Sequence, residues 1–151
     1  MSTTNTNTKT GPDLTKAAPR SPHQKIGNFV IIARTIDKCR ASLWGNLGEY
    51  HFDCPLDNQL FGFKGLKGSD FKAFVSEGHA DEEIADWVSK NGTPKTVAEI
   101  EAWDAEAAAN NFSAAPEKKA WLEGESVRLG LDKDASLFDM LDADDKASFK
   151  K

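Results

Sequence analysis

Arg34, Asp37 and Arg40 are the ionisable side chains with the clearest chemical potential. Asp37 and Arg40 fall within the apolar stripe of a predicted helix, and Arg34 and Lys38 flank them. Two guanidinium groups beside one carboxylate can hold an anionic or polar small molecule, since guanidinium N–H groups donate in a fixed, planar arrangement. The same charges can instead form a buried salt bridge that fixes how the helices and the loop at residues 46–55 dock. They are therefore expected either to line a recessed polar pocket or to have a structural role.

The loop GEYHFDCPLD carries side chains of types that bind metal ions, among them His51, Asp53 and Cys54. Their spacing matches no closed zinc pattern, so we expect no metal and no cofactor. Cys54 can also act as a nucleophile with His51 as its base, provided that folding brings the two together. Otherwise Tyr50 packs and His51 hydrogen-bonds a helix end. If the pocket exists, Tyr50 and His51 join its ligand-binding residues.

The three charges are positioned by a helix predicted to run from Pro22 to about Leu43. Ser21 and Gln24 have the spacing of a capping box, and proline suits the first helical position. At about 100° per residue, Asp37 and Arg40 fall about 20° and 40° from the start of the apolar stripe, so both are expected to be partly buried and to need partners. The stripe itself comprises Ile26, Phe29, Val30, Ala33 and Ile36.

Further helices are predicted wherever a capping residue or proline precedes apolar residues at helical spacing, and no stretch alternates like a strand. They begin near Pro55, Ser69, Asp81, Thr96, Pro116 and Ser136. Residues 1–12 are polar and aperiodic and are predicted to form a disordered tail. The expected fold is all-α: a single compact domain of six to seven short helices over residues 13–151.

Composition excludes several classes of function. The net charge of −5 divides into +5 over residues 1–40 and −10 over the remainder, and an acidic body disfavours binding to nucleic acid. No apolar run is long enough for a membrane span, and the polar N-terminus has no secretory signal. Two cysteines, Cys39 and Cys54, are too few for a disulfide framework and are expected to be reduced. A cytoplasmic protein is the resulting expectation.

Several segments together resemble one protein family. They are DLTKAAPRSPHQKIGNFVIIARTIDKCRA, GEYHFDCPLDNQLFGFKG, GHADEEIADWV, TPKTVAEIEAW and LGLDKDASLFDMLDADD. The chain is similar in them to the bacterial family called domain of unknown function 5069, which implies an all-helical bacterial protein without an assigned activity. Two positions depart from the family pattern: Ala80 stands where the family usually has serine, and Asp104 where it usually has asparagine.

The leading functional hypothesis is a non-enzymatic binding or interaction module whose partner is a small molecule or a protein. It rests on Arg34, Asp37, Arg40, Tyr50 and His51 as ligand-binding residues, with no catalytic residue assigned. The alternative is a small enzyme that uses the Arg34/Asp37/Arg40 cluster with His51 or Cys54. A cleft onto which these groups converge favours an enzyme, and an exposed aromatic patch with Trp44 or Trp121 favours a binding module. The sequence predicts no particular oligomeric state.

Overall fold

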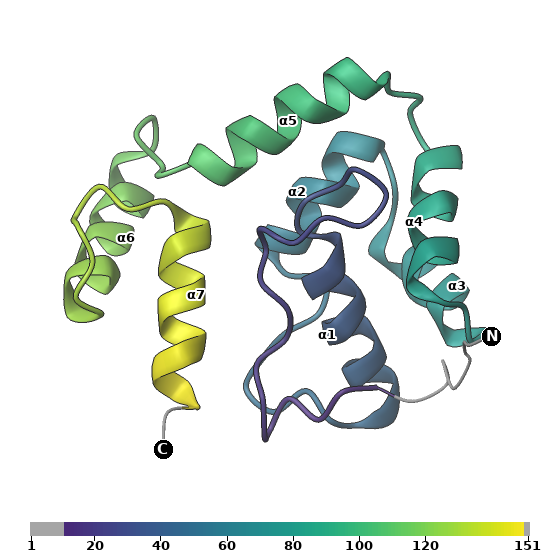
Figure 1. Ribbon diagram of the computed structural model, residues 1–151, viewed down its shortest axis with the longest axis horizontal. Coiled ribbons are helices and arrows are strands. Elements are labelled where there is room, and N and C mark those ends of the chain that lie inside the picture. The colour runs from purple at the N-terminus through teal and green to yellow at the C-terminus, as the bar shows by residue number, and fades with distance from the viewer. Residues whose placement is uncertain (1–10, 150–151) are drawn as a thin grey trace.

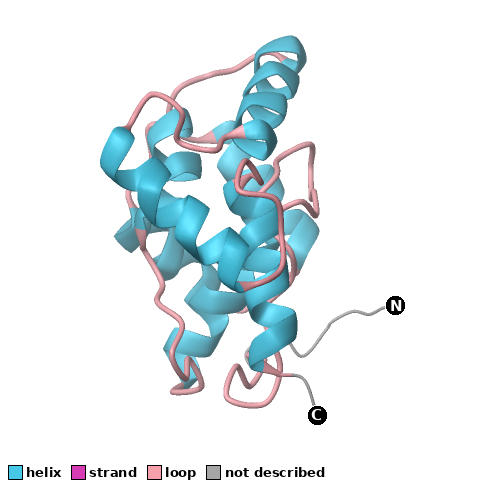
Figure 2. Ribbon diagram, turned by 90° about the vertical axis from the view of Figure 1, so that its left-hand side faces the viewer, coloured by secondary structure: helices cyan, strands magenta, loops and turns pink. Residues whose placement is uncertain are grey.

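The computed structural model describes residues 11–149, which form seven α-helices and no strands (Figures 1 and 2). The helices are α1 (Ile32–Trp44), α2 (Pro55–Lys64), α3 (Gly68–Ser76), α4 (Asp81–Lys90), α5 (Val97–Ala109), α6 (Pro116–Arg128) and α7 (Leu137–Ser148). The predicted all-α class is thus confirmed. Most of the predicted N-terminal tail lies outside the described residues, but Gly11 lies so close to the α1 backbone that a Cβ there would be 2.6 Å from Arg40.

Helix α1 occupies the centre of the fold. Helices α2, α3 and α4 contact it on one side, whereas α6 and α7 pack together on the other, and α5 extends across the top of the view and contacts α7 (Figure 1). The largest fully buried side chains are Phe29, Phe61, Lys64, Phe71, Phe138, Leu14, Ile31, Ile32, Ile36, Leu60, Ile84 and Leu122. None of the helices within residues 11–149 combines the length and apolar character that a transmembrane span needs.

The first helix begins at Ile32 and not, as predicted, at Pro22. Gly27 and Asn28 have φ values of 59° and 77°, a left-handed backbone that interrupts a right-handed helix. The residues on either side of this pair exchange two backbone hydrogen bonds of 3.2 Å and so close a tight turn. Phe29, Val30 and Ile31 are buried and Ile26 is partly buried, but all four precede α1, so their positions do not define which face of α1 is buried.

Helix caps account for the boundaries that the sequence predicted well. Thr96 and Glu99 form both hydrogen bonds of a capping box, at 3.1 and 2.8 Å, and Ser136 Oγ accepts from a backbone N–H of the first turn of α7. At the start of α4 only half of such a box exists. Glu83 accepts from the backbone N–H of Ala80 at 2.8 Å, but alanine has no side-chain oxygen to cap the helix in return.

The helical spacing of the apolar residues predicts that Val97 and Trp121 face the core, but both are exposed. Val97 on α5 is 57% exposed, and Trp121 on α6 is 51% exposed. The helical period nevertheless predicts the buried face of each helix correctly, since Ile100 and Ala107 on α5 and Leu122 on α6 are buried. Val97 lies in the first turn of α5, and Trp121 directly precedes the buried Leu122 on α6. Both residues therefore lie at the edge of the apolar face of their own helix.

Asp104 connects α5 to the turn that precedes α1. Its Oδ1 accepts a hydrogen bond of 3.1 Å from the backbone N–H of Val30, and its side chain is 5% exposed. The buried Oδ2 accepts no hydrogen bond, and Lys25 Nζ lies 3.5 Å away. Burial therefore raises the pKa of the Asp104 carboxyl above its ordinary value of 3.8, although the Val30 hydrogen bond and Lys25 oppose the shift.

Asp104→Asn is expected to stabilise the protein at neutral pH by about 1 kcal/mol, because it removes a poorly solvated charge and keeps the acceptor for Val30. A carboxyl with a raised pKa in the folded state binds protons more tightly there, so it costs stability as the pH rises above 3.8. Urea denaturation from pH 3.5 to 7 should show the advantage of the variant growing with pH and then levelling off. An advantage that is constant or shrinks across this range would contradict the assignment.

Candidate ligand-binding site

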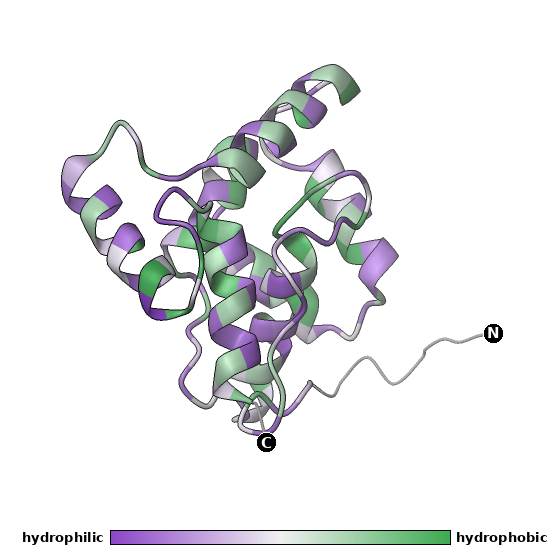
Figure 3. Ribbon diagram, turned by 60° about the vertical axis from the view of Figure 1, so that its left-hand side comes forward, coloured by the Kyte–Doolittle hydropathy of each residue, from purple (hydrophilic) through white to green (hydrophobic). Residues whose placement is uncertain are grey.

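Helix α1 is buried almost all round although it carries four charged side chains. Nine of its thirteen residues are buried, among them Arg34, Asp37 and Lys38. Hydrophilic residues are accordingly visible within the central helices of the molecule (Figure 3). Buried charges are costly unless they are paired, so their partners decide what this helix can do.

Each charge on α1 is paired with an opposite charge from a different segment. The pairs are Arg34 with Asp145 on α7, Asp37 with Arg20, Lys38 with Asp57 on α2, and Arg40 with Asp81 on α4. Their N–O distances lie between 2.7 and 3.0 Å. The four pairs thus fasten the N-terminal segment and three helices to one central element.

Asp37 and Arg40 lie in an ion-pair network away from the cavity described below. Asp37 accepts three hydrogen bonds from Arg20, through its backbone N–H, Nε and NH2. Arg20 also contacts Asp81 at 2.8 Å, and Arg40 contacts the same carboxylate at 2.8 Å. The two residues are therefore partly buried as predicted. Arg20 compensates Asp37 and Asp81 compensates Arg40, in place of a direct pair between Asp37 and Arg40.

Arg34 and Lys38 project from another face of α1. They are one helical turn apart, and the structure places both on the wall of a cavity of about 1110 Å³. Both side chains are 4% exposed, and Asp57, the partner of Lys38, is fully buried behind the wall. Asp145, the partner of Arg34, likewise lies behind the wall. The two cations therefore line the cavity, whereas the carboxylates that pair with them do not.

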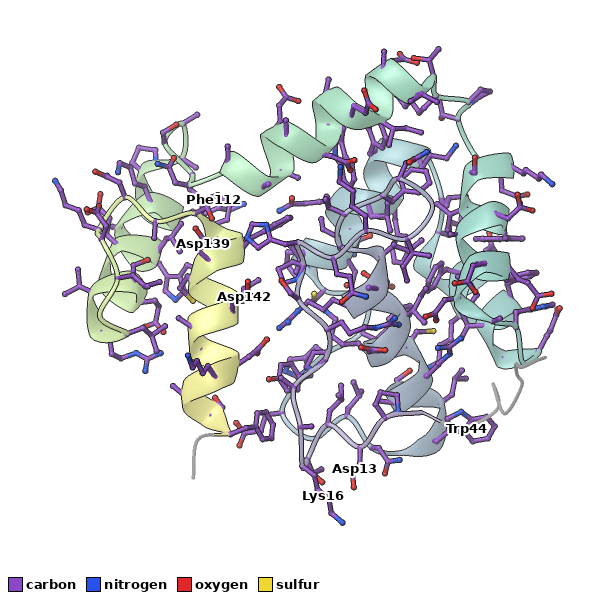
Figure 4. The ribbon with its side chains drawn as sticks, viewed as in Figure 1. Asp13, Lys16, Trp44, Phe112, Asp139 and Asp142 are labelled. Carbon is purple, nitrogen blue, oxygen red and sulfur yellow. The ribbon has the colours of Figure 1, made fainter. Side chains whose placement is uncertain are left out.

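The cavity lies between the α1–α2 loop, the start of α2 and the α6–α7 pair. Its polar lining comes mainly from α1 and this loop, and its apolar lining from the N-terminal segment and helices α2, α6 and α7, with Phe112 from the loop between α5 and α6 (Figure 4). The apolar lining residues are Leu14, Pro55, Leu56, Phe112, Trp121, Leu137, Leu141 and Phe149. A second hollow of about 520 Å³, beside α3 and α4, contains none of the predicted site residues.

Tyr50 belongs to both the wall and the buried pair behind it. Its hydroxyl donates to Asp145 Oδ1 at 2.7 Å, and the Arg34 guanidinium lies over its ring at 5.5 Å. Burial, and then the Asp145 carboxylate, raise the pKa of the Tyr50 phenol above its ordinary value. Tyr50 is consequently protonated at neutral pH and serves as a hydrogen-bond donor.

Cys54 and His51 also line the cavity. Lys38 Nζ donates to Cys54 Sγ at 3.2 Å, and Cys54 is the residue immediately before α2. His51 is exposed, and in the part of the chain that the structure describes no hydrogen bond joins it to Cys54. Cys39, on the far side of α1, is fully buried, and burial raises the pKa of its thiol to about 12. Both cysteines are free thiols.

The structure thus brings together Arg34, Tyr50 and His51 from the predicted ligand-binding residues, but not Asp37 and Arg40. Sequence reasoning missed Lys38, which it treated as flanking the charged cluster. The available signal was its spacing of four residues from Arg34, which places the two side chains on one helix face.

Trp44 and Trp121 are the two tryptophans that an exposed aromatic patch was expected to include. Trp121 is half exposed and lines the cavity, whereas the other exposed tryptophan, Trp44, does not. No local pattern distinguishes them, because the cavity is formed only when α6 and α7 pack against the α1–α2 loop.

A family model described as "Domain of unknown function (DUF5069)" matches residues 16–147 of the chain. No curated protein matches the chain.

Proposed function

Since the chain belongs to the DUF5069 family, whose description names no activity, we propose on the geometry alone that it binds a small molecule in the cavity between α1 and the α6–α7 pair. The observation that supports this proposal is that the lining of one cavity combines buried hydrogen-bond donors with apolar side chains. Small-molecule sites are typically concave, mostly apolar and equipped with a few fixed polar groups. A cytoplasmic location and a bacterial source belong to the same proposal.

The proposed ligand has an apolar body and a polar or anionic end that accepts hydrogen bonds. Arg34 and Lys38 line the wall and have more N–H groups than their carboxylates accept, whereas the Tyr50 hydroxyl, which donates to Asp145, offers a ligand only an acceptor. Because Asp145 and Asp57 already balance the two cations, the donors orient a polar group more than they attract charge over a distance. Apolar contact with Trp121 and its neighbours supplies most of the affinity.

Asp37 and Arg40 have a separate role in this proposal. With Arg20 and Asp81 they hold the N-terminal segment and α4 against α1, and so support the cavity wall from behind. Their substitution should change stability before it changes ligand binding.

The anionic, apolar fluorophore 1-anilinonaphthalene-8-sulfonate tests the cavity directly. We expect one binding site per chain, with affinity at least about tenfold weaker in Trp121→Ala, because a large aromatic contact is worth more than about 1.4 kcal/mol. Trp44→Ala is the matched control, since Trp44 is 45% exposed but does not line the cavity. Native mass spectrometry of protein from its own host then identifies the natural ligand. Equal affinity of both variants for the fluorophore would refute the proposed site.

A small enzyme is the second candidate, and the contact between Lys38 Nζ and Cys54 Sγ favours it. An ammonium group beside a sulfur at the start of a helix is a setting in which cysteines react as nucleophiles. Cys54→Ser separates the two functions. A binding module keeps its affinity for the host ligand in this variant, whereas an enzyme loses turnover of that ligand.

A further inference from the structure

A second group of side chains lies outside the cavity, where the segment before α1 meets α7. His23 Nε2 is 2.9 Å from Asp139 Oδ1 and 4.0 Å from Asp142 Oδ2. One nitrogen or oxygen atom from each of the three residues lies within 4.8 Å of the others. Figure 4 shows the two aspartates on α7, about one helical turn apart. Nothing in the proposed function uses this group.

No lysine or arginine side chain within the described residues pairs with the carboxylates of Asp139 and Asp142. Asp145, the next acid along this row of α7, is neutralised by Arg34 at 2.7 Å. The Ser21 hydroxyl donates to Asp142 at 3.0 Å, which supplies a dipole but no charge. Two like charges three residues apart on a helix repel each other, so a bound cation would stabilise this end of α7.

We propose that His23, Asp139 and Asp142 bind a divalent transition-metal ion of the Zn²⁺ type. An imidazole nitrogen with two carboxylate oxygens is a donor set that such ions accept, and water can complete the coordination. With metal–ligand bonds of about 2.0–2.2 Å, tetrahedral donors stand about 3.3–3.6 Å apart, which lies between the two distances to His23. Small rotations of the aspartates therefore suffice to form the site.

The His23 ring is held in the orientation that the site requires. Its face-to-edge contact with Phe138, at 5.1 Å between centroids, fixes the ring against α7 and directs Nε2 to the carboxylates. The ion would connect segments that are 116 residues apart in sequence, and so fasten α7 to the N-terminal segment. This separation explains why ligand spacing along the chain predicted no metal.

His79 provides a matched comparison with His23, because the same types of metal ligand surround it. It also has two carboxylates nearby, but Glu77 lies 3.0 Å from Nε2 whereas Glu83 lies 3.6 Å from Nδ1. An ion on one ring nitrogen cannot reach the carboxylate beside the other. Composition alone would predict two sites, and geometry predicts one.

Isothermal titration of the chelator-treated full chain with Zn²⁺, and with Co²⁺ as a spectroscopic probe, tests the proposal. We expect one ion per chain and a rise in the melting temperature of about 5 °C or more at a hundredfold excess over the dissociation constant. His23→Ala and Asp139→Asn should each weaken binding at least tenfold, and His79→Ala should leave it unchanged. Asp139 is 61% exposed, so its variant folds even if the other does not.

Absence of binding at millimolar ion would overturn the proposal. Undiminished binding in both site variants would also overturn it, and would place the ion elsewhere, for example at Cys54. The Co²⁺ absorption spectrum distinguishes these cases, because a thiolate ligand adds an intense charge-transfer band that nitrogen and oxygen ligands lack.

Discussion

Replacing Lys38 by methionine is expected to lower the free energy of unfolding by about 3–5 kcal/mol, the cost of breaking a buried ion pair from one side. The Lys38 and Asp57 side chains are 4% and 0% exposed, and their charged atoms lie 3.0 Å apart. Methionine fills a similar volume but leaves the Asp57 carboxylate in the core without its cation. Urea denaturation monitored by circular dichroism measures the loss.

A second substitution shows whether the charge is the cause. Asp57 also accepts hydrogen bonds from the Thr35 hydroxyl and the Asp53 backbone N–H, at 2.7 and 2.9 Å. Asparagine keeps an oxygen that accepts from the Asp53 backbone N–H, and its amide N–H can donate to the Thr35 hydroxyl oxygen, so Lys38→Met with Asp57→Asn should recover much of the loss. If the double variant is no more stable than Lys38→Met, lost packing of the lysine stem explains the effect instead.

Asp37→Ala is expected to cost about 2–3 kcal/mol. The change removes the acceptor of three hydrogen bonds from Arg20, one of them from its backbone. The cost is smaller than for Lys38 because Arg20 is 29% exposed and keeps its contact with Asp81. Denaturant melts again give the magnitude.

A matched substitution and a double-mutant cycle locate the partner of Asp37. Asp86→Ala, at a carboxylate that is 59% exposed on α4, should cost less than about 0.5 kcal/mol. The cycle between Asp37 and Arg20 should show a coupling of about 1–3 kcal/mol, and the cycle between Asp37 and Arg40 a smaller one. A cost for Asp37→Ala as small as that for Asp86→Ala would mean that Asp37 is exposed and the ion-pair network is not formed.

The positions of most helices could be predicted from sequence because their signals are local. Thr96 with Glu99 and Ser136 cap the helices that follow them, and Pro116 begins α6, as expected. The start of α1 was the exception. Gly27 and Asn28 are residue types typical of a turn. The apolar residues on either side of them nevertheless continue at the helical period, which predicts an uninterrupted helix.

The sequence by itself predicted that Asp37 and Arg40 are partly buried and need partners, because both fall within the apolar stripe of the predicted first helix. Only the tertiary structure decided which group compensates each one. Arg20 and Asp145 lie 17 and 111 residues from their partners, and no periodic pattern encodes such contacts. The cavity depends on the same kind of information, since its donors come from α1 and its apolar wall from α6 and α7. Helical period and caps act within a few residues, whereas ion pairs and cavities arise where distant segments meet.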